Sequence, residues 1–202
     1  FVNGISHADF RALNDNPSRP QFNRAVLGGV APGSTLKPFL ALAGLDSGVR
    51  RPEDRTLSTG MFHLPGTRRG WGDSHRGGHG WTDARKSIYE SVNTYYYQLA
   101  LDMGVQRYDE YMAKYGYGQK TGIDLAGEIE GIVPSPASKL KYEKTRWCPG
   151  DMVNSSIGQG LWKVTPLQLV RGVAAIADDG RMRRPYLAAE QRAAFDAPWQ
   201  PL

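Results

Sequence analysis

One short motif contains residues whose types and spacing could form a nucleophilic site. Ser34 and Lys37 lie in the stretch PGSTLKPF, directly before an apolar run. Residues three positions apart are neighbours on one face of a helix, so the lysine amine can lie beside the serine oxygen. A serine becomes a nucleophile when a neighbouring base removes its proton. Lys37 can act as that base only if burial lowers its pKa.

A second motif offers the groups that such a reaction also needs. Ser91, Val92 and Asn93 form the only Ser-x-Asn triplet in the chain. The Ser91 hydroxyl could relay a proton between a lysine and a leaving amine. The Asn93 amide could hold a substrate carbonyl and help to orient the lysine. We therefore predict that the two motifs meet in the folded protein.

The elements that must position these motifs are helices. The apolar spacing predicts a helix from Ser34 to about Leu45, a helix over 83–103 that breaks at 91–93, and a third helix over 105–114. A fourth helix should begin at Thr165 and Pro166. Its expected buried side consists of Leu167, Leu169, Val170, Val173 and Ile176. We expect residues 1–28, 60–82 and 116–160 to be mostly loop, and MRRPYL to begin a strand.

The chain contains another Ser-x-x-Lys pair, Ser138 and Lys141. It lies in the polar stretch SPASKLKYEK, with no apolar helix behind it. Because a base of lowered pKa requires burial, the surroundings favour the first pair as the reactive one.

Composition sets limits on the class of protein. The 202 residues are 40% hydrophobic and 22% charged, which predicts one globular domain. The net charge is +5, but the basic residues form no stripe or nucleic-acid-binding module, so we expect no nucleic-acid partner. Attraction to a polyanionic surface such as a cell wall stays open. Cys148 is the single cysteine, which excludes an internal disulfide. The abrupt ends of the sequence indicate a piece of a longer protein.

Several segments in the same order resemble the transpeptidase domain of class B, monofunctional penicillin-binding proteins. They include NRAVLGGVAPGSTLKPF, SIYESVNTYYYQLALDMG and GDMVNSSIGQGLWKVTPLQL. The elongation type, penicillin-binding protein two, is the most similar. The resemblance implies an α+β fold like that of the serine β-lactamases, with a helical subdomain against an antiparallel sheet. Residues 1–202 would form a partial transpeptidase domain, truncated before the later sheet strands.

The resemblance also implies a role for each motif residue. Ser34 would be the acylated nucleophile, Lys37 its base, Ser91 the proton shuttle, and Asn93 the contact for the amide of the donor peptide. The chain would be a peptidoglycan D,D-transpeptidase without a cofactor. Its partners would be stem peptides, β-lactams bound covalently at Ser34, and, through parts outside this chain, a membrane glycosyltransferase and elongation proteins. The expected location is the periplasmic face of the bacterial inner membrane, with the anchor outside this chain.

Lys120, Thr121 and Gly122 spell the third motif of the family but occupy the wrong place in its order. They precede the IGQG and TPLQ segments, whereas the family's strand follows them. We interpret the triplet as a loop and expect the true third motif beyond Leu202. Without that strand the site would lack the second oxyanion N–H, and losing one such donor costs about 10²–10³ in rate.

A cluster of Asp73, His75 and His79 could suggest a metal site. Some relatives have a structural metal in this region, with a cysteine in the middle of the Ser-x-Asn motif. That position is Val92 here, and Cys148 is distant in the sequence. We therefore predict no metal.

Two alternative functions stay open at this point. In a D,D-carboxypeptidase or β-lactamase, water would resolve the acyl-enzyme, and fast β-lactam hydrolysis would reveal it. The other alternative is a β-lactam-sensing domain or a catalytically inactive scaffold. A signalling module in the parent protein, or the lack of a Lys-Thr/Ser-Gly strand after residue 202, would favour that alternative.

Overall fold

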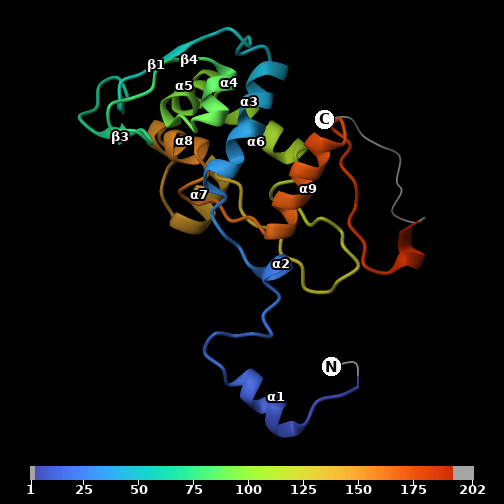
Figure 1. Cartoon of the computed structure of the whole chain (residues 1–202). Helices are drawn as coiled ribbons and strands as arrows, with labels where there is room; N and C mark the ends of the chain where they lie inside the picture. Colours follow the sequence, from blue (N-terminus) through green and yellow to red (C-terminus); the bar gives the residue numbers. More distant parts are fainter. Residues whose placement is uncertain (1–2, 193–202) are drawn as a thin grey trace.

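The computed structural model describes residues 3–192, in which helices predominate and the strands are short (Figure 1). In chain order the elements are α1 (His7–Asn14), α2 (Arg24–Leu27), the 3₁₀ helix η1 (Gly33–Leu36), α3 (Lys37–Asp46), β1 (Thr56–Ser58), β2 (Met61–His63), β3 (Gly70–Gly72), β4 (Gly80–Thr82), α4 (Ala84–Tyr89), α5 (Asn93–Met103), α6 (Val105–Lys114), α7 (Pro136–Glu143), α8 (Pro149–Ser156), α9 (Pro166–Ala177) and the 3₁₀ helix η2 (Ala189–Gln191).

Helix α5 lies at the centre of the core, where α3, α4, α6 and α8 pack around it. Tyr95, Tyr96 and Leu99 on α5 are at most 1% exposed. Helix α3 approaches α5 closely at Gly44, where a Cβ atom would lie 2.7 Å from a methyl carbon of Leu99. A side chain at this position would push the two helices apart. The packing therefore fixes α3, which begins at Lys37, against α5, which begins at Asn93.

The segment expected to be an irregular loop over 60–82 contains strands instead. Strand β1 pairs with β4 and β2 pairs with β3, both antiparallel, so one hairpin is nested inside the other. Each strand has only three residues. Strands this short give little alternation of apolar and polar residues, and the glycines hide the signal further. This part of the prediction was wrong.

The helices that frame the two motifs agree with the prediction. Helix α3 continues directly from η1, α6 spans Val105–Lys114, and the expected break separates α4 from α5 at residues 90–92. Four helices were missed, namely α1, α2, α7 and α8. Each follows an N-cap residue, Ser6, Asn23, Ser135 and Cys148 respectively. Helix α2 has only four residues, and the other three have few apolar residues, so their periodicity is weak. Figure 1 shows α1 standing apart from the helical body.

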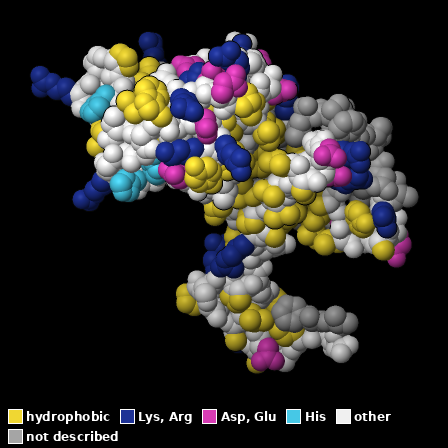
Figure 2. All heavy atoms as spheres, turned by 45° about the horizontal axis from the view of Figure 1, so that its top comes forward, with side chains coloured by type: hydrophobic (Ala, Val, Ile, Leu, Met, Phe, Trp, Pro, Cys, Tyr) yellow, Lys and Arg dark blue, Asp and Glu magenta, His cyan; other side chains and the backbone are white. Residues whose placement is uncertain are grey.

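Helix α9 begins at Thr165 and Pro166 as predicted, but the expected buried side was only partly right, since of that side only Leu169 packs against the core of the described residues. Val170 and Val173 are 63% and 55% exposed, whereas Gln168, Gly172 and Ala175 are buried. The described residues pack on the side of α9 that carries the smaller residues. Periodicity identifies an apolar side but not the element that covers it. Figure 2 shows hydrophobic side chains gathered over the middle of the visible face of the body.

The described structure is an α+β arrangement of helices with small antiparallel sheets, as the predicted fold class requires. The stretch MRRPYL, over 182–187, does not form the expected strand. Within residues 3–192, none of the helices has the length and apolar character needed to cross a bilayer.

Candidate active site

Ser34 lies in the first turn of η1, and its side chain is exposed. The turn is held from behind, because the Gly33 N–H donates to the carbonyl of Gly158 at 3.0 Å. Gly158 has a φ of +70°, and a Cβ atom there would lie 2.3 Å from the Gly33 oxygen. Only glycine fits both the conformation and the space. The IGQG segment is therefore the support of the Ser34 turn.

Lys37 is buried one helical turn after Ser34, with 2% of its surface exposed. Its amine donates to the Ser91 carbonyl oxygen at 2.6 Å, to Ser91 Oγ at 2.8 Å and to Asn93 Oδ1 at 2.7 Å. These three acceptors satisfy the three donors of an ammonium group. The structure thus joins the two motifs, as the sequence predicted.

The environment of Lys37 makes its amine easier to deprotonate. Burial lowers the pKa of Lys37 from 10.5 to about 8, and the charge of Asp73 opposes this shift. The ring of Tyr96 lies 5.5 Å from the amine and forms part of the apolar surroundings. At pH 7 about a tenth of the Lys37 amines are then neutral, compared with about three in ten thousand for an unperturbed lysine.

The hydroxyl of Ser34 forms no hydrogen bond to that amine. Within residues 3–192, the Ser34 side chain forms no hydrogen bond, and Lys37 directs its donors toward Ser91 and Asn93 instead. That the amine serves the Ser34 oxygen stays a prediction. Hydrogen bonds in a catalytic site often form only with substrate bound. A proton from Ser34 could reach Lys37 through the Ser91 hydroxyl.

The Ser-x-Asn triplet lies at the break between α4 and α5. Ser91 has a φ of +54°, a left-handed conformation that costs about 1 to 3 kcal/mol for a residue other than glycine. Val92 is fully buried and anchors the triplet in the core. This backbone directs both the Ser91 carbonyl and its hydroxyl toward Lys37. The strained backbone therefore lies at Ser91, the residue expected to relay the proton.

The residues that suggested a metal site are engaged in hydrogen bonds. The carboxylate of Asp73 already accepts hydrogen bonds from the backbone N–H groups of Ser74, Asn93 and Thr94. The two ring nitrogens of His79 contact Glu90 and Ser74, at 2.7 and 3.0 Å. The part of the chain that the structure describes contains no group of three or more potential metal ligands. The carboxylate of Asp73 and both ring nitrogens of His79 are thus used in hydrogen bonds, and the absence of a metal stays a prediction.

The triplet at Lys120–Gly122 is a loop, as predicted. Thr121 is buried, and its N–H and hydroxyl both donate to Glu128 Oε1, at 2.8 and 2.6 Å. The Gly122 N–H donates to the other carboxylate oxygen of Glu128. These groups serve the local loop, so the triplet has a structural role. The position of the true third motif beyond Leu202 stays a prediction.

The second Ser-x-x-Lys pair is also structural. Ser138 is the third residue of α7 and forms a capping box with Ser135. Lys141 is exposed. The pair therefore lacks both a free hydroxyl and a buried amine, in agreement with the choice of Ser34 and Lys37.

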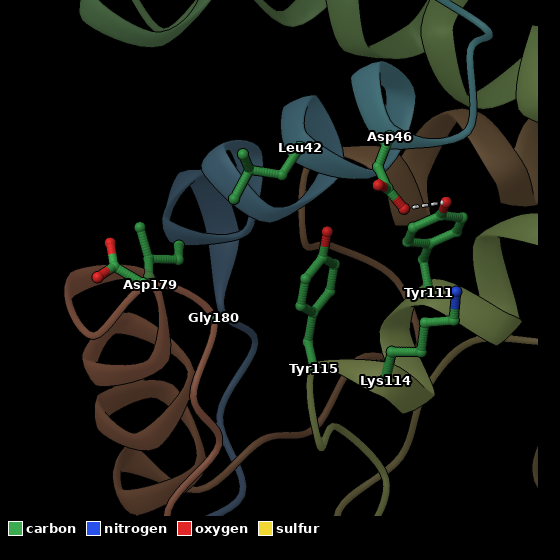
Figure 3. Close-up of a pocket in the computed structure, with 8 residues that line it drawn as sticks. Leu42, Asp46, Tyr111, Lys114, Tyr115, Asp179 and Gly180 are labelled. Carbon is green, nitrogen blue, oxygen red and sulfur yellow. Dashed lines mark hydrogen bonds between the residues drawn. The ribbon is translucent and has the colours of Figure 1, made fainter. Parts of the chain in front are cut away.

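A separate cavity of about 290 Å³ lies near the other end of α3 from Lys37. Figure 3 shows Tyr111 and Tyr115 beside Asp46, whose Oδ2 accepts the Tyr111 hydroxyl at 2.6 Å. Leu42 and Ile176 give the cavity an apolar wall. None of its lining residues belongs to the two motifs, so it is not part of the candidate site.

Comparisons with known proteins agree with this geometry. The family described as "Penicillin binding protein transpeptidase domain" matches residues 6–200. The peptidoglycan D,D-transpeptidase MrdA of Acinetobacter baumannii is 41% identical over 93% of this chain, and MrdA of Escherichia coli K12 is 40% identical over the same share. The chain spans only 28% and 30% of these two relatives.

Solved structures show the same similarity. The crystal structure of Pseudomonas aeruginosa PBP2 in complex with WCK 5153 has a TM-score of 0.86 and 39% identity, covering 92% of this chain and 40% of that chain. Helicobacter pylori PBP2, in a complex with MreC, has a TM-score of 0.88 and 29% identity, covering 98% of this chain and 36% of that chain. The arrangement of helices described above therefore recurs in solved proteins.

Proposed function

Because this chain belongs to the penicillin-binding protein transpeptidase family, we propose that Ser34, Lys37, Ser91 and Asn93 form the catalytic centre of a peptidoglycan D,D-transpeptidase. The observation that carries the proposal is the position of the Lys37 amine. It is buried and lies within 2.8 Å of side-chain oxygens on both Ser91 and Asn93, which are more than fifty residues away in the sequence. A buried amine of lowered pKa, in reach of a hydroxyl relay, is typical of a general base.

The reaction proceeds by acyl transfer. Ser34 Oγ attacks the carbonyl of the penultimate D-alanine of a stem pentapeptide, while its proton passes to neutral Lys37, directly or through Ser91. The Ser34 N–H, at the start of η1, has no acceptor within its helix and is available to the oxyanion. When the tetrahedral intermediate collapses, the C–N bond breaks and the proton passes to the leaving D-alanine amine.

The second half-reaction repeats these steps in reverse order. The amine of a neighbouring stem attacks the acyl-Ser34 ester and loses a proton to the Ser91 and Lys37 pair. The ester C–O bond breaks, a new amide cross-link forms, and Ser34 regains its proton. Asn93 would hold the amide of the donor peptide through its Nδ2 group, since its Oδ1 is bonded to Lys37. A β-lactam, whose ring amide resembles the D-Ala-D-Ala end, would acylate Ser34 in the same way.

The wider setting belongs to the whole protein. We propose that it lies at the periplasmic face of the bacterial inner membrane, with its anchor and third motif outside these residues. We propose that it acts together with a membrane glycosyltransferase and elongation proteins; a solved relative is a complex of PBP2 with MreC. One solved relative is described as a peptidoglycan synthase complex that coordinates polymerization and crosslinking.

The test is intact mass after incubation with a penicillin. It uses the 202-residue chain and the longer natural polypeptide that contains it, each with Ser34→Ala and with Ser138→Ala as the matched control. A stable adduct that Ser34→Ala abolishes and Ser138→Ala preserves would support the proposal. The absence of an adduct on the longer polypeptide, or its loss with Ser138→Ala alone, would overturn it.

A further inference from the structure

Asp73 is a buried carboxylate that the reaction above does not use. It lies in the loop between β3 and β4, and its side chain is 0% exposed. Its contacts within residues 3–192 include no Lys or Arg ion pair, and the nearest ring nitrogen of His79 is 3.8 Å away. A buried carboxylate with no direct Lys or Arg partner must be stabilised by hydrogen bonds. Its donors are Ser58 Oγ at 2.7 Å, the Ser74 N–H at 2.8 Å, the Asn93 N–H at 2.7 Å and the Thr94 N–H at 3.1 Å.

Two of these donors are the first N–H groups of α5. The N-cap of α5 is Val92, which has no side-chain oxygen to accept from them. Asp73 supplies the missing acceptor from a segment about twenty residues earlier in the sequence. It also places a negative charge at the positive end of the helix dipole. Burial alone would raise the pKa of Asp73, but hydrogen bonds from Thr94, Ser58 and the Ser74 backbone lower it to about 2. The carboxylate is therefore ionised at working pH.

The residues near Asp73 also contact the N-terminal part of the Ser-x-Asn motif, at Ser91 and the preceding Glu90. Ser74 Oγ donates to the Ser91 carbonyl oxygen at 3.3 Å, and the same oxygen accepts the Lys37 amine. His79 contacts Glu90, the residue before Ser91, through its Nδ1 atom. The loop thus contacts the residues on both sides of the left-handed Ser91. A strained backbone persists only where its surroundings hold it, and this loop provides that restraint.

We propose that Asp73 is a positioning residue of the active site, which caps α5 from the β3–β4 loop and thereby fixes Ser91 and Asn93 against Lys37. The inference rests on the proposed function for its effect on catalysis, but the cap itself does not. Asp73 touches neither Ser34 nor the expected substrate position. It acts through the backbone of the Ser-x-Asn motif, in place of an N-cap side chain.

The charge of Asp73 has a second consequence. The groups that face Lys37 are Ser91, Asn93 and Tyr96 from the motif and α5, and Asp73 from the β3–β4 loop. Among them Asp73 carries a permanent negative charge, which raises the pKa of Lys37 against the effect of burial. Removing that charge should lower the pKa of Lys37 further and move the midpoint of the rising limb of the acylation rate to lower pH.

The test compares Asp73 with Asp83, which caps the neighbouring helix α4 through a hydrogen bond from the Lys86 N–H at 2.8 Å. Asp73→Ala removes the cap of α5, and Asp83→Ala removes a cap of the same kind away from Lys37. Asp73→Asn is the milder variant, because its amide oxygen can still accept one of the two α5 N–H groups. Each variant is made in the 202-residue chain and in the longer natural polypeptide.

The first measurement is hydrogen exchange of the Asn93 and Thr94 amides in the 202-residue chain. Both should exchange faster in Asp73→Ala, and one of the two in Asp73→Asn, while Asp83→Ala changes only the amides of α4. This measurement needs no activity. If the wild-type protein proved not to acylate, the function would fail while the cap was still tested. Unchanged exchange in both Asp73 variants would overturn the cap.

The second measurement is the rate of β-lactam acylation per folded molecule as a function of pH. Since hydrogen bonds to charged groups are strong, Asp73→Ala should acylate about 10- to 100-fold more slowly. Asp73→Asn should acylate more slowly at the plateau, with the midpoint of its rising limb at lower pH. Asp83→Ala should match the wild type. An equal loss in Asp83→Ala, or wild-type rates with an unmoved pH profile in Asp73→Asn, would reduce Asp73 to a general structural role.

Discussion

Replacing Lys37 by methionine should make the stability of this protein respond less to pH while abolishing acylation. Methionine fills nearly the same volume but cannot take a charge. In the wild type the amine is buried, and its pKa falls from 10.5 to about 8 because burial disfavours the charged form. Folding therefore has to overcome the cost of a buried ammonium wherever the lysine is protonated. That cost is absent from Lys37→Met.

The magnitude follows from the shift. Between pH 8 and 10.5 the folded protein has released the Lys37 proton while the unfolded chain still binds it. Stability therefore rises with pH in this window and is constant with respect to Lys37 below it. A pKa difference of one unit corresponds to about 1.36 kcal/mol, so the free energy of unfolding rises by on the order of 3 kcal/mol across the window. Below pH 8 the wild type has no such gain, although it keeps the hydrogen bonds to Ser91 and Asn93.

The assay is urea unfolding of the wild type and of Lys37→Met between pH 7 and 10. The difference between their free energies of unfolding cancels the titration of the tyrosines and other groups. It should grow in favour of the wild type by on the order of 2 to 3 kcal/mol by pH 10.

Lys139→Met is the matched control, since Lys139 is buried but paired with Asp151, which raises its pKa. The stability that this ion pair contributes is present below pH 10.5 and is lost only above that value. The difference in the free energy of unfolding between the wild type and Lys139→Met should therefore stay constant up to pH 10. A flat difference for Lys37→Met as well would show that the amine has an ordinary pKa, and the argument for Lys37 as the base would fail.

Three further predictions address the site and its supports. The β-lactam acylation rate of the longer natural polypeptide should rise with pH to a plateau with a midpoint near 8, the pKa of Lys37, and a midpoint above 10 would contradict it. Gly158→Ala, where the new Cβ would meet a backbone carbonyl oxygen at 2.3 Å, should lower the free energy of unfolding by more than the roughly 1 to 3 kcal/mol of backbone strain alone. Gly160→Ala, at a similar positive φ with its closest contact at 3.7 Å, should show only that strain, so equal losses in urea unfolding would refute the steric argument. Thr121→Val leaves Glu128 Oε1 without one donor and should lower the free energy of unfolding by about 1 to 3 kcal/mol, while the acylation rate per folded molecule stays unchanged. Loss of acylation in this variant would show that the triplet is a catalytic motif.

The helices near the site could be predicted because their signals are local. Proline and threonine at a helix start, glycine after its end and apolar spacing between them gave α3, α6 and the start of α9. The break at Ser91 followed from the preference of serine and asparagine for caps. The short strands β1 to β4 carry no such signal, and their pairing joins residues up to 26 positions apart, such as Thr56 and Thr82. Sequence spacing contains no information on that pairing.

The sequence by itself determined which residues could do the chemistry. It placed Ser34 and Lys37 on one helical face, put Ser91 and Asn93 at a helix break, and ordered the segments as the family does. It also separated the Lys120–Gly122 triplet from the third motif by its place in that order.

Only the tertiary structure decided the contacts, burial and electrostatic environment of those residues. It brought Lys37 within 2.8 Å of Ser91 and Asn93, buried its amine, and assigned Asp73 to the N-terminus of α5. It also left Val170 and Val173 on the apolar side of α9 exposed within the described residues. The physical reason is that helix starts and i, i+3 contacts depend on neighbouring residues, whereas desolvation and charge depend on all the segments that pack around a group.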